Sequence, residues 1–370
     1  MKKIISLLLM VVLVTTLFAG CAKKEEAKPV EEVKTEATVE AKTEEPVKEA
    51  EPVVEVVESN YPDRAVNNIV PFNAGGGTDL WNRALSAAME ETLGTKVLVN
   101  NMPGGGPGGT GQAFMWDAPH DGYTILGTSE TPLLVPIMTG MPQTTKDFEY
   151  FIAGGSPGLL CVNKDSGITS IEDLMTKTSA DPEKYKVAST NGGLWFILAN
   201  LFGKYADVKL GNVTYDGSRP AITACVSGEV AAVTASAGEV ADFIKSGDLI
   251  PIVTIQTEDF EFPGYGTIPA VTKSLPVLEK FLPLNQFIGF MVPVDTPADI
   301  IAKLQESFAA AMASEEIKAF AESQYAVFYN LTGEEARAYC AKAQSTMSWI
   351  LHEMGLSEFS PEEFGIPKPE

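Results

Sequence analysis

Residues 69–79 read Ile-Val-Pro-Phe-Asn-Ala-Gly-Gly-Gly-Thr-Asp, a short apolar run followed by a glycine-rich loop. The apolar run from Ile69 to Phe72 predicts a buried strand. The segment after the loop predicts a helix that ends near Gly94, because Leu80, Ala84 and Ala88 recur at helical spacing. A strand, a glycine-rich turn and a helix in this order are typical of α/β proteins.

The same pattern continues along the chain. A second strand is predicted at 97–99, followed by a glycine-rich loop and a short helix, and a third strand at 124–127. This alternation predicts a parallel sheet with right-handed crossovers. A second unit is predicted after Thr131. Its expected strands are 151–153, 159–162, 186–188, 213–215 and 231–234, and its expected helices are about 170–178, 194–205 and 219–227.

The chain is then expected to return to the first unit. A strand at 250–255 leads back, and 297–313 and 333–354 have the spacing of amphipathic helices. Two crossovers between two lobes form a hinge. The predicted division is lobe one at 61–130 plus 256–370, and lobe two at 131–255.

The N-terminus resembles an export signal. Lys2 and Lys3 precede an apolar stretch, and small residues lead to Cys21. This arrangement resembles a bacterial lipobox, in which residues 1–20 are removed and Cys21 receives lipid; an ordinary secretory signal is the alternative. Residues 21–60 lack aromatic side chains and apolar periodicity, which predicts a disordered linker between the lipid anchor and the body. A charged solvating tail is the alternative for this segment.

The composition of the chain excludes one class of partner and describes its cysteines. The chain of 370 residues has a net charge of -22, which argues against a nucleic-acid partner because phosphate binding needs a basic surface. The remaining cysteines are Cys161, Cys225 and Cys340. Their odd number leaves at least one unpaired, and their apolar surroundings favour buried structural thiols.

Three small-residue loops each follow a predicted strand and begin a predicted helix. They are 73–79, 103–111 and 189–193. Backbone N–H groups at helix N-termini can hold an anion without any basic side chain. A single such loop is more often a tight turn, but three across two lobes favour a ligand-binding cleft. Asp79 is expected to cap its helix, with contact to a ligand amine or hydroxyl as the alternative. Trp195 is expected in the core or at an apolar wall of the cleft.

Other site classes have weaker support. Gly104-x-Gly106-x-x-Gly109 matches a dinucleotide fingerprint, but it follows the second strand and contains Pro107. No nucleophile elbow, metal-ligand spacing or acid–base pair is evident in the sequence. We therefore expect neither an enzyme nor a cofactor or metal.

Several motifs in order resemble the substrate-binding (Bug-type) receptors of tripartite tricarboxylate transporters. They span roughly residues 61–355. The motifs are Pro71-Phe72-x-Ala74-Gly75-Gly76-Gly77-Thr78-Asp79, Leu93-Gly94, 97–100, Pro103 to Gly106, Asp121-Gly122-Tyr123-Thr124, Tyr215-Asp216-Gly217-x-x-Pro220-Ala221, Ser227 to Val230, and Pro293-x-x-Thr296-Pro297.

The resemblance implies an α/β, type II-like periplasmic-binding-protein fold that closes like a flytrap on a small organic carboxylate. It also implies a monomer that delivers this ligand to large and small membrane subunits. The implied ligand-binding residues are Asn73, Ala74, Gly77, Thr78, Asp79, Gly108, Gly109, Thr110, Ser129, Thr131, Ser189, Thr190, Asn191, Gly192, Asp216 and Gly217.

The sequence departs from the family pattern in the second lobe. Phe196 stands where His is common, and Ala231 where Asp often occurs. These departures predict a less polar second-lobe wall and a ligand with an apolar or aromatic body. The alternative functions are a sensor of the same fold that serves a signalling kinase, a surface hydrolase and a surface adhesin.

Overall fold

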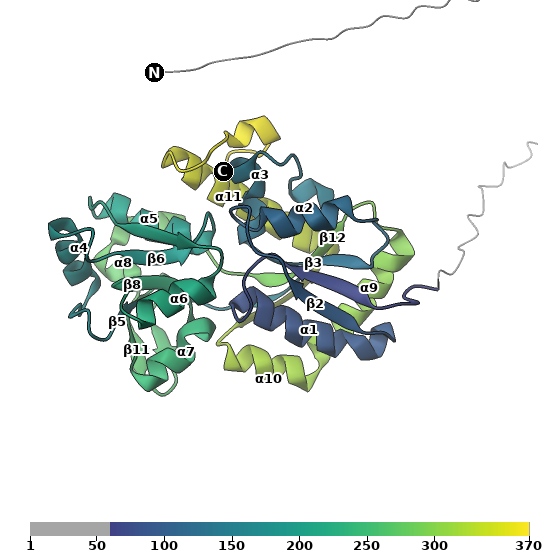
Figure 1. The fold of residues 1–370 in the computed structure, drawn as a ribbon, viewed down its shortest axis with the longest axis horizontal. Helices are drawn as coiled ribbons and strands as arrows, with labels where there is room; N and C mark the ends of the chain where they lie inside the picture. The colour runs from purple at the N-terminus through teal and green to yellow at the C-terminus, as the bar shows by residue number, and fades with distance from the viewer. Residues whose placement is uncertain (1–59, 370) are drawn as a thin grey trace, which may run out of the picture. The chain divides into compact units, whose positions relative to one another are not determined.

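The computed structural model describes residues 60–369. The predicted signal segment, Cys21 and the linker lie outside these residues. The described chain forms two lobes, each built on its own sheet with helices packed on both faces (Figure 1). The two-lobed α/β prediction is therefore confirmed. Among residues 60–369, no helix is long and apolar enough to cross a membrane.

Lobe one contains a six-stranded sheet in the order β13-β4-β12-β3-β1-β2. The strands β1, β2 and β3 are parallel, as predicted, whereas β12 is antiparallel to both β3 and β4. The strands are β1 (Val66–Val70), β2 (Val97–Asn101), β3 (Thr124–Ser129), β4 (Phe148–Gly155), β12 (Ile288–Pro293) and β13 (Val327–Thr332).

Helices cover both faces of this sheet. On one face α1 packs against α9, and Trp81, Phe151 and Phe308 lie in the apolar cluster between the helices and the sheet. Burying such side chains contributes about 1.5–3 kcal/mol each before the opposing entropy is counted. The helices of this lobe are α1 (Gly77–Leu93), α2 (Gly109–Asp117), α3 (Val135–Thr139), α9 (Ala298–Ala313), α10 (Glu315–Ser323) and α11 (Gly333–Glu353).

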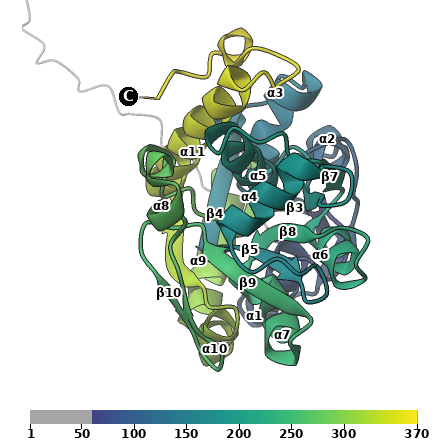
Figure 2. The same cartoon turned by 90° about the vertical axis from the view of Figure 1, so that its left-hand side faces the viewer.

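Lobe two contains a five-stranded sheet in the order β7-β6-β8-β5-β9. In Figure 2 this lobe faces the viewer, with α5 on one side of the sheet and α6 and α7 on the other. The elements are β5 (Gly158–Asn163), α4 (Ile171–Ala180), β6 (Val187–Thr190), α5 (Leu194–Tyr205), β7 (Asn212–Tyr215), α6 (Ser218–Val226), β8 (Ala232–Ser236), α7 (Ala237–Ser246), β9 (Leu249–Thr254), β10 (Phe260–Phe262), β11 (Gly266–Ile268) and α8 (Val271–Ser274).

The predicted lobe boundaries were wrong at both crossovers. Strand β4 was assigned to lobe two, but it pairs with β12 and β13 in the first sheet. Strand β9 pairs with β5 in the second sheet, as its place in the predicted lobe two requires, but the chain does not return to lobe one directly after it. The hairpin β10–β11 and helix α8 also pack on lobe two, since Phe262 and Val271 lie in its apolar clusters. Lobe one therefore comprises about 60–155 and 286–369.

The two crossovers lie side by side. The backbone N–H of Ser156 donates to Oε1 of Gln286 at 3.1 Å, and a Cβ on Gly155 would lie 1.9 Å from the carbonyl oxygen of Gln286. Such close backbone packing requires glycine at residue 155. Cys161, Cys225 and Cys340 are all buried and unpaired, as the prediction of structural thiols favoured.

Candidate functional site

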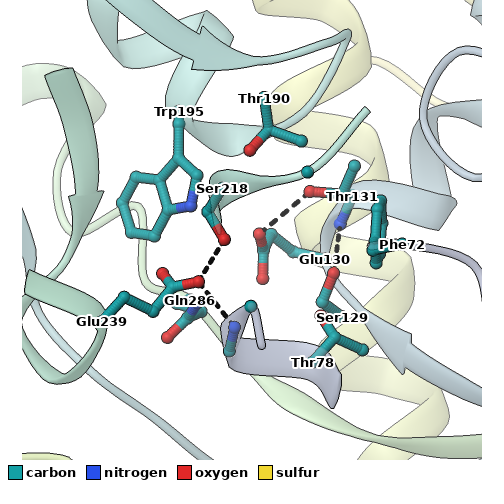
Figure 3. Close-up of a pocket in the computed structure, with 13 residues that line it drawn as sticks. Phe72, Thr78, Ser129, Glu130, Thr131, Thr190, Trp195, Ser218, Glu239 and Gln286 are labelled. Carbon is teal, nitrogen blue, oxygen red and sulfur yellow. Dashed lines mark hydrogen bonds between the residues drawn. The ribbon is translucent and has the colours of Figure 1, made fainter. Parts of the chain in front are cut away.

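Loops from both lobes enclose one small cavity (Figure 3). Its free volume is about 20 Å³, which suffices for a single water molecule or little more. The lining residues from lobe one are Phe72, Gly76, Gly77, Thr78, Ser129, Glu130, Thr131 and Gln286, and those from lobe two are Thr190, Trp195, Gly217, Ser218 and Glu239.

Strand ends and helix starts position the lobe-one residues. Gly77 and Thr78 begin α1 directly after the loop that follows β1. Ser129 is the last residue of β3, and Glu130 and Thr131 follow it. The cavity therefore lies at the carboxyl ends of the parallel strands, where α/β sheets bind ligands.

Lobe two supplies its residues in the same way. Thr190 ends β6 and Trp195 lies in the first turn of α5. Ser218 begins α6 after β7, and Glu239 lies in the first turn of α7 after β8. Three strand-to-helix connections thus point toward lobe one.

The carboxylate of Glu239 joins the two lobes inside the cavity. Its Oε1 accepts a hydrogen bond of 2.6 Å from the backbone N–H of Gly77 and another from the Ser218 hydroxyl. Its Oε2 accepts from the N–H and the hydroxyl of Ser236, at 3.2 and 2.6 Å, which completes a capping box on α7. Four donors on two oxygens fill the acceptor capacity of this side chain.

Glu130 is the second acid of the cavity. Its side chain is 2% exposed, and its oxygens accept hydrogen bonds of 3.1 Å from the Thr131 hydroxyl and from the N–H of Phe287. Burial, with a smaller contribution from the charge of Glu239, raises the pKa of Glu130 to about 7, although these hydrogen bonds act in the opposite direction.

Four side chains that line the cavity have donor groups that make no hydrogen bond within residues 60–369. These groups are the hydroxyls of Thr78 and Thr190, the indole N–H of Trp195 and the side-chain nitrogen of Gln286. Each of these residues is at least nine-tenths buried. Buried polar groups are normally hydrogen-bonded, so these donors indicate a site for an acceptor-rich ligand.

The structure brings part of the predicted site together. Six predicted residues line the cavity: Gly77, Thr78, Ser129, Thr131, Thr190 and Gly217. Asn73 and Ala74 instead line a neighbouring open groove of about 410 Å³. The side-chain amide of Asn73 donates to the carbonyl oxygen of Asp216 at 3.4 Å, so both residues contribute to contact between the lobes.

The other predicted residues lie outside the cavity lining. Asp79 accepts hydrogen bonds from the Gly75 N–H at 2.8 Å and from Asn101 at 2.9 Å, and forms an ion pair with Arg83. It therefore holds the glycine-rich loop from the first turn of α1, but no side-chain capping hydrogen bond forms at the N-terminus of that helix. The residues at the start of α2 are Gly108, Gly109 and Thr110. In lobe two, the Ser189 hydroxyl donates to Asn212, and the backbone N–H of Asn191 donates to the carbonyl oxygen of Tyr215. Gly192 lies against Pro107 and Met138 of lobe one.

Sequence reasoning missed Phe72, Gly76, Glu130, Ser218, Glu239 and Gln286 as site residues. Glu130 stands between two residues that were predicted. The sequence pattern Ser236-x-x-Glu239 is the signature of a capping box, so it could have located the start of α7 and, with it, Glu239. Because Ser218 and Glu239 are polar, the second-lobe wall is more polar than the departures from the family pattern predicted. Trp195 is its main apolar element.

Comparison with known proteins gives a consistent assignment. A model of the tripartite tricarboxylate transporter family receptor matches residues 82–356. The chain is 26% identical to the protein BugT of Bordetella pertussis over 302 residues, which covers 80% of this chain and 90% of that protein. It is 31% identical over 263 residues to a protein encoded in the tcbD–tcbE intergenic region of Pseudomonas sp. (strain P51), covering 70% and 76% of the two chains.

Solved structures share the fold. The periplasmic binding protein BugD superposes with a TM-score of 0.73 at 22% identity, over 80% of this chain and 99% of that one. A Rhodopseudomonas palustris protein solved with adipate gives a TM-score of 0.72 at 21% identity, over 80% and 99%. The protein MatC of the same organism, solved with malate, gives 0.70 at 21% identity, over 78% and 98%.

Proposed function

Because the chain belongs to the tripartite tricarboxylate transporter family receptors, we propose that it is an extracytoplasmic receptor that encloses a small organic carboxylate between its two lobes. The observation that carries this proposal is the set of unpartnered donor groups, on buried residues of both lobes, that line one cavity. A carboxylate offers two acceptor oxygens and satisfies such donors without a basic side chain.

Binding requires the lobes to separate. The free volume of about 20 Å³ is too small for an organic acid, and the cavity is closed by contacts that cross between lobes. The two adjacent crossovers at Ser156 and Gln286 supply the hinge for this motion. A ligand then enters the open cleft and replaces the Gly77–Glu239 contact when the lobes close again.

Thermal unfolding of the purified protein tests the receptor function. The panel contains mono- and dicarboxylates, including malate and adipate, together with citrate, benzoate and amino acids. A ligand present at 100 times its dissociation constant stabilises the folded protein by about 2.7 kcal/mol. A selective, saturable rise in the unfolding midpoint supports the proposal. The absence of any shift, with no ligand released by denaturation and detected by mass spectrometry, contradicts it.

The proposal includes delivery to a transporter. We expect the ligand-loaded monomer to dock on the large and small membrane subunits of a tripartite transporter. Cells that lack this receptor should lose uptake of the radiolabelled ligand at low concentration, and plasmid expression should restore it. Unchanged uptake with normal receptor binding would favour the sensor alternative.

The membrane anchor is a further part of the proposal. Residues 1–20 have the pattern of a signal segment, Cys21 that of a lipidated residue, and 21–60 that of a linker. Replacement of Cys21 by Ser should move the protein from the membrane fraction to the soluble extracytoplasmic fraction and abolish labelling with a fatty acid. Retention of both properties would show that Cys21 is not the anchor.

A further inference from the structure

The cavity contains two acidic side chains and no basic one among its lining residues. Glu130 comes from lobe one and Glu239 from lobe two. The nearest basic side chain of the neighbouring groove, Arg219, lies over the ring of Phe243, with 5.3 Å between the guanidinium carbon and the ring centroid. A ligand in the cavity therefore meets two acids without a basic counter-charge.

The two acids lie close enough to affect each other. The charge of Glu239 contributes to the raised pKa of Glu130, whose main cause is burial. Glu130 is 2% exposed and Glu239 is 9% exposed, so water screens this repulsion poorly. The ligand carboxylate already brings a third acidic group into the same enclosed space, and a second carboxylate would bring a fourth, whereas an ammonium group would offset one negative charge.

Acceptor capacity is available for such an ammonium group. Glu130 has one hydrogen-bond donor from the rest of the chain on each side-chain oxygen, so each oxygen can accept another. Glu239 is saturated in the closed structure, but separation of the lobes removes the N–H of Gly77 from its Oε1. Both acids can then accept from a ligand ammonium group.

Separation of the lobes also provides hydrogen-bond donors for the carboxylate end of the ligand. Once the lobes separate, the Gly77 N–H is free at the N-terminus of α1. The unpartnered hydroxyl of Thr190 and the indole N–H of Trp195 face the same cavity from lobe two. A carboxylate can take the Gly77 N–H while Glu239 takes the ammonium group, so both partners of the Gly77–Glu239 hydrogen bond that is lost on opening are satisfied again on closure.

We propose that the ligand is an amino carboxylate, with its ammonium group held by Glu130 and Glu239 and its carboxylate held by Gly77, Thr190 and Trp195. This inference rests on the proposed receptor function and specifies its ligand class. It replaces the prediction of an apolar or aromatic body, because Glu239 and Ser218 line the second-lobe wall.

Matched ligands test the inference by isothermal titration calorimetry. The members of each set share one carbon chain with one carboxylate, and carry a methyl, an ammonium or a second carboxylate group at the same position. Pentanoate, 4-aminobutyrate and glutarate form one such set, and 2-methylbutyrate, 2-aminobutyrate and ethylmalonate form another. Chain lengths of about three to six carbons are compared. We expect the tightest amino carboxylate to bind at least about tenfold more tightly than its methyl and dicarboxylate counterparts.

Two variants and a control test whether Glu130 and Glu239 cause the preference for the ammonium group. Glu130→Gln and Glu239→Gln should each reduce the preference for the ammonium group to within about threefold. Glu316→Gln removes the same charge from an exposed position on α10 and should leave the preference unchanged. Circular dichroism confirms that each variant is folded.

The possible outcomes separate the inference from the receptor function. Dicarboxylates or simple acids that bind as tightly as the amino carboxylates overturn the inference and leave the receptor function supported. An ammonium preference that survives in both variants also overturns it. If no carboxylate of any set binds, the inference and the receptor function both fail.

Discussion

The backbone N–H of Gly77 in lobe one donates a 2.6 Å hydrogen bond to the carboxylate of Glu239 in lobe two. Glycine allows this approach without displacing the carboxylate, since a Cβ at residue 77 would lie 3.1 Å from Oε1 of Glu239. A protein carboxylate thus occupies the helix N-terminus at which we expect a ligand carboxylate to bind. The two carboxylates compete for one donor, so this contact couples closure of the empty protein to ligand affinity.

Glu239→Gln should shift the empty protein toward the open state. Gln at this position can keep the capping box with Ser236 through its oxygen, but its NH2 group then faces the Gly77 N–H, so the hydrogen bond between the lobes, worth about 1 kcal/mol, is lost. The ratio of closed to open molecules should fall roughly fivefold. Fluorescence energy transfer between dyes on the two lobes measures the ratio, with Glu316→Gln as the control. An unchanged distribution would show that this contact does not hold the empty protein closed.

Gly193→Ala should prevent full closure by steric overlap. A Cβ at residue 193 would lie 2.5 Å from the Thr131 hydroxyl oxygen in the opposite lobe. The backbone at Gly193 has φ -102° and ψ -169°, which alanine adopts without strain, so lobe two should fold normally. We expect ligand affinity to fall by about tenfold or more with only a small change in unfolding midpoint.

A second substitution provides the control for Gly193→Ala. Replacing Thr131 by Ala on its own shows how much binding depends on the hydroxyl. The double variant removes the overlapping atoms and should restore closure in the fluorescence measurement. If Gly193→Ala closes as fully as the wild-type protein, the described packing of residue 193 against Thr131 is not required for the closed state.

Local sequence patterns predicted local structure well. Helix α5 has the predicted bounds, 194–205, because its apolar periodicity is uninterrupted. The lobe boundaries failed because they depend on long-range pairing: β4 belongs to lobe one through its antiparallel pairing with β12, which lies more than a hundred residues later. No local pattern specifies which sheet a fully buried strand joins.

The residues that line the cavity were likewise predictable only in part. Thr78, Ser129 and Thr190 were named from the family resemblance, and Thr78 and Thr190 also lie in small-residue loops that follow predicted strands. Glu239 and Gln286 were not, because their place in the cavity depends on how the two lobes approach each other. Their role depends on tertiary contacts, because the sequence around Glu239 indicates only a helix cap and the sequence around Gln286 only the start of a strand.

Glu130 should make stability depend on pH in the neutral range. Its pKa is raised by burial and by Glu239 from the usual 4.5 to about 7, and Tyr329 and Tyr339 also face it. Between these values the folded state holds a proton that the unfolded state has lost. The unfolding free energy should therefore fall as pH rises through this window, by up to about 1.4 kcal/mol per pH unit for this one group.

Comparison of the wild type with Glu130→Gln isolates this effect. Urea unfolding at several pH values gives the difference between the two proteins, in which all other titrating groups largely cancel. Glu130→Gln should gain stability relative to the wild type as pH rises from about 4.5 to 7, and the difference should level off above that range. A difference that does not vary with pH would show that Glu130 titrates normally.

Asp79→Asn should weaken the glycine-rich loop at the start of α1. The Asp79 side chain accepts from Gly75, Arg83 and Asn101 and is 3% exposed, so the amide of Asn would place donors against donors. The expected loss is about 2 kcal/mol of unfolding free energy. Ligand affinity should fall as well, because this loop positions Gly77 and Thr78 beside the cavity.

The pH dependence of this loss has a definite sign. Burial raises the pKa of Asp79, but the hydrogen bonds from Arg83, Gly75 and Asn101 outweigh burial and hold the pKa below its usual 3.8. The stabilisation is therefore fully present above about pH 4 and is lost as pH falls through the lowered pKa. The wild type and Asp79→Asn should converge in stability in acid.

Asp117→Asn, at an exposed position at the end of α2, is the control for Asp79→Asn and should change neither stability nor affinity. Equal stability of wild type and Asp79→Asn at neutral pH would show that the buried carboxylate does not hold the loop.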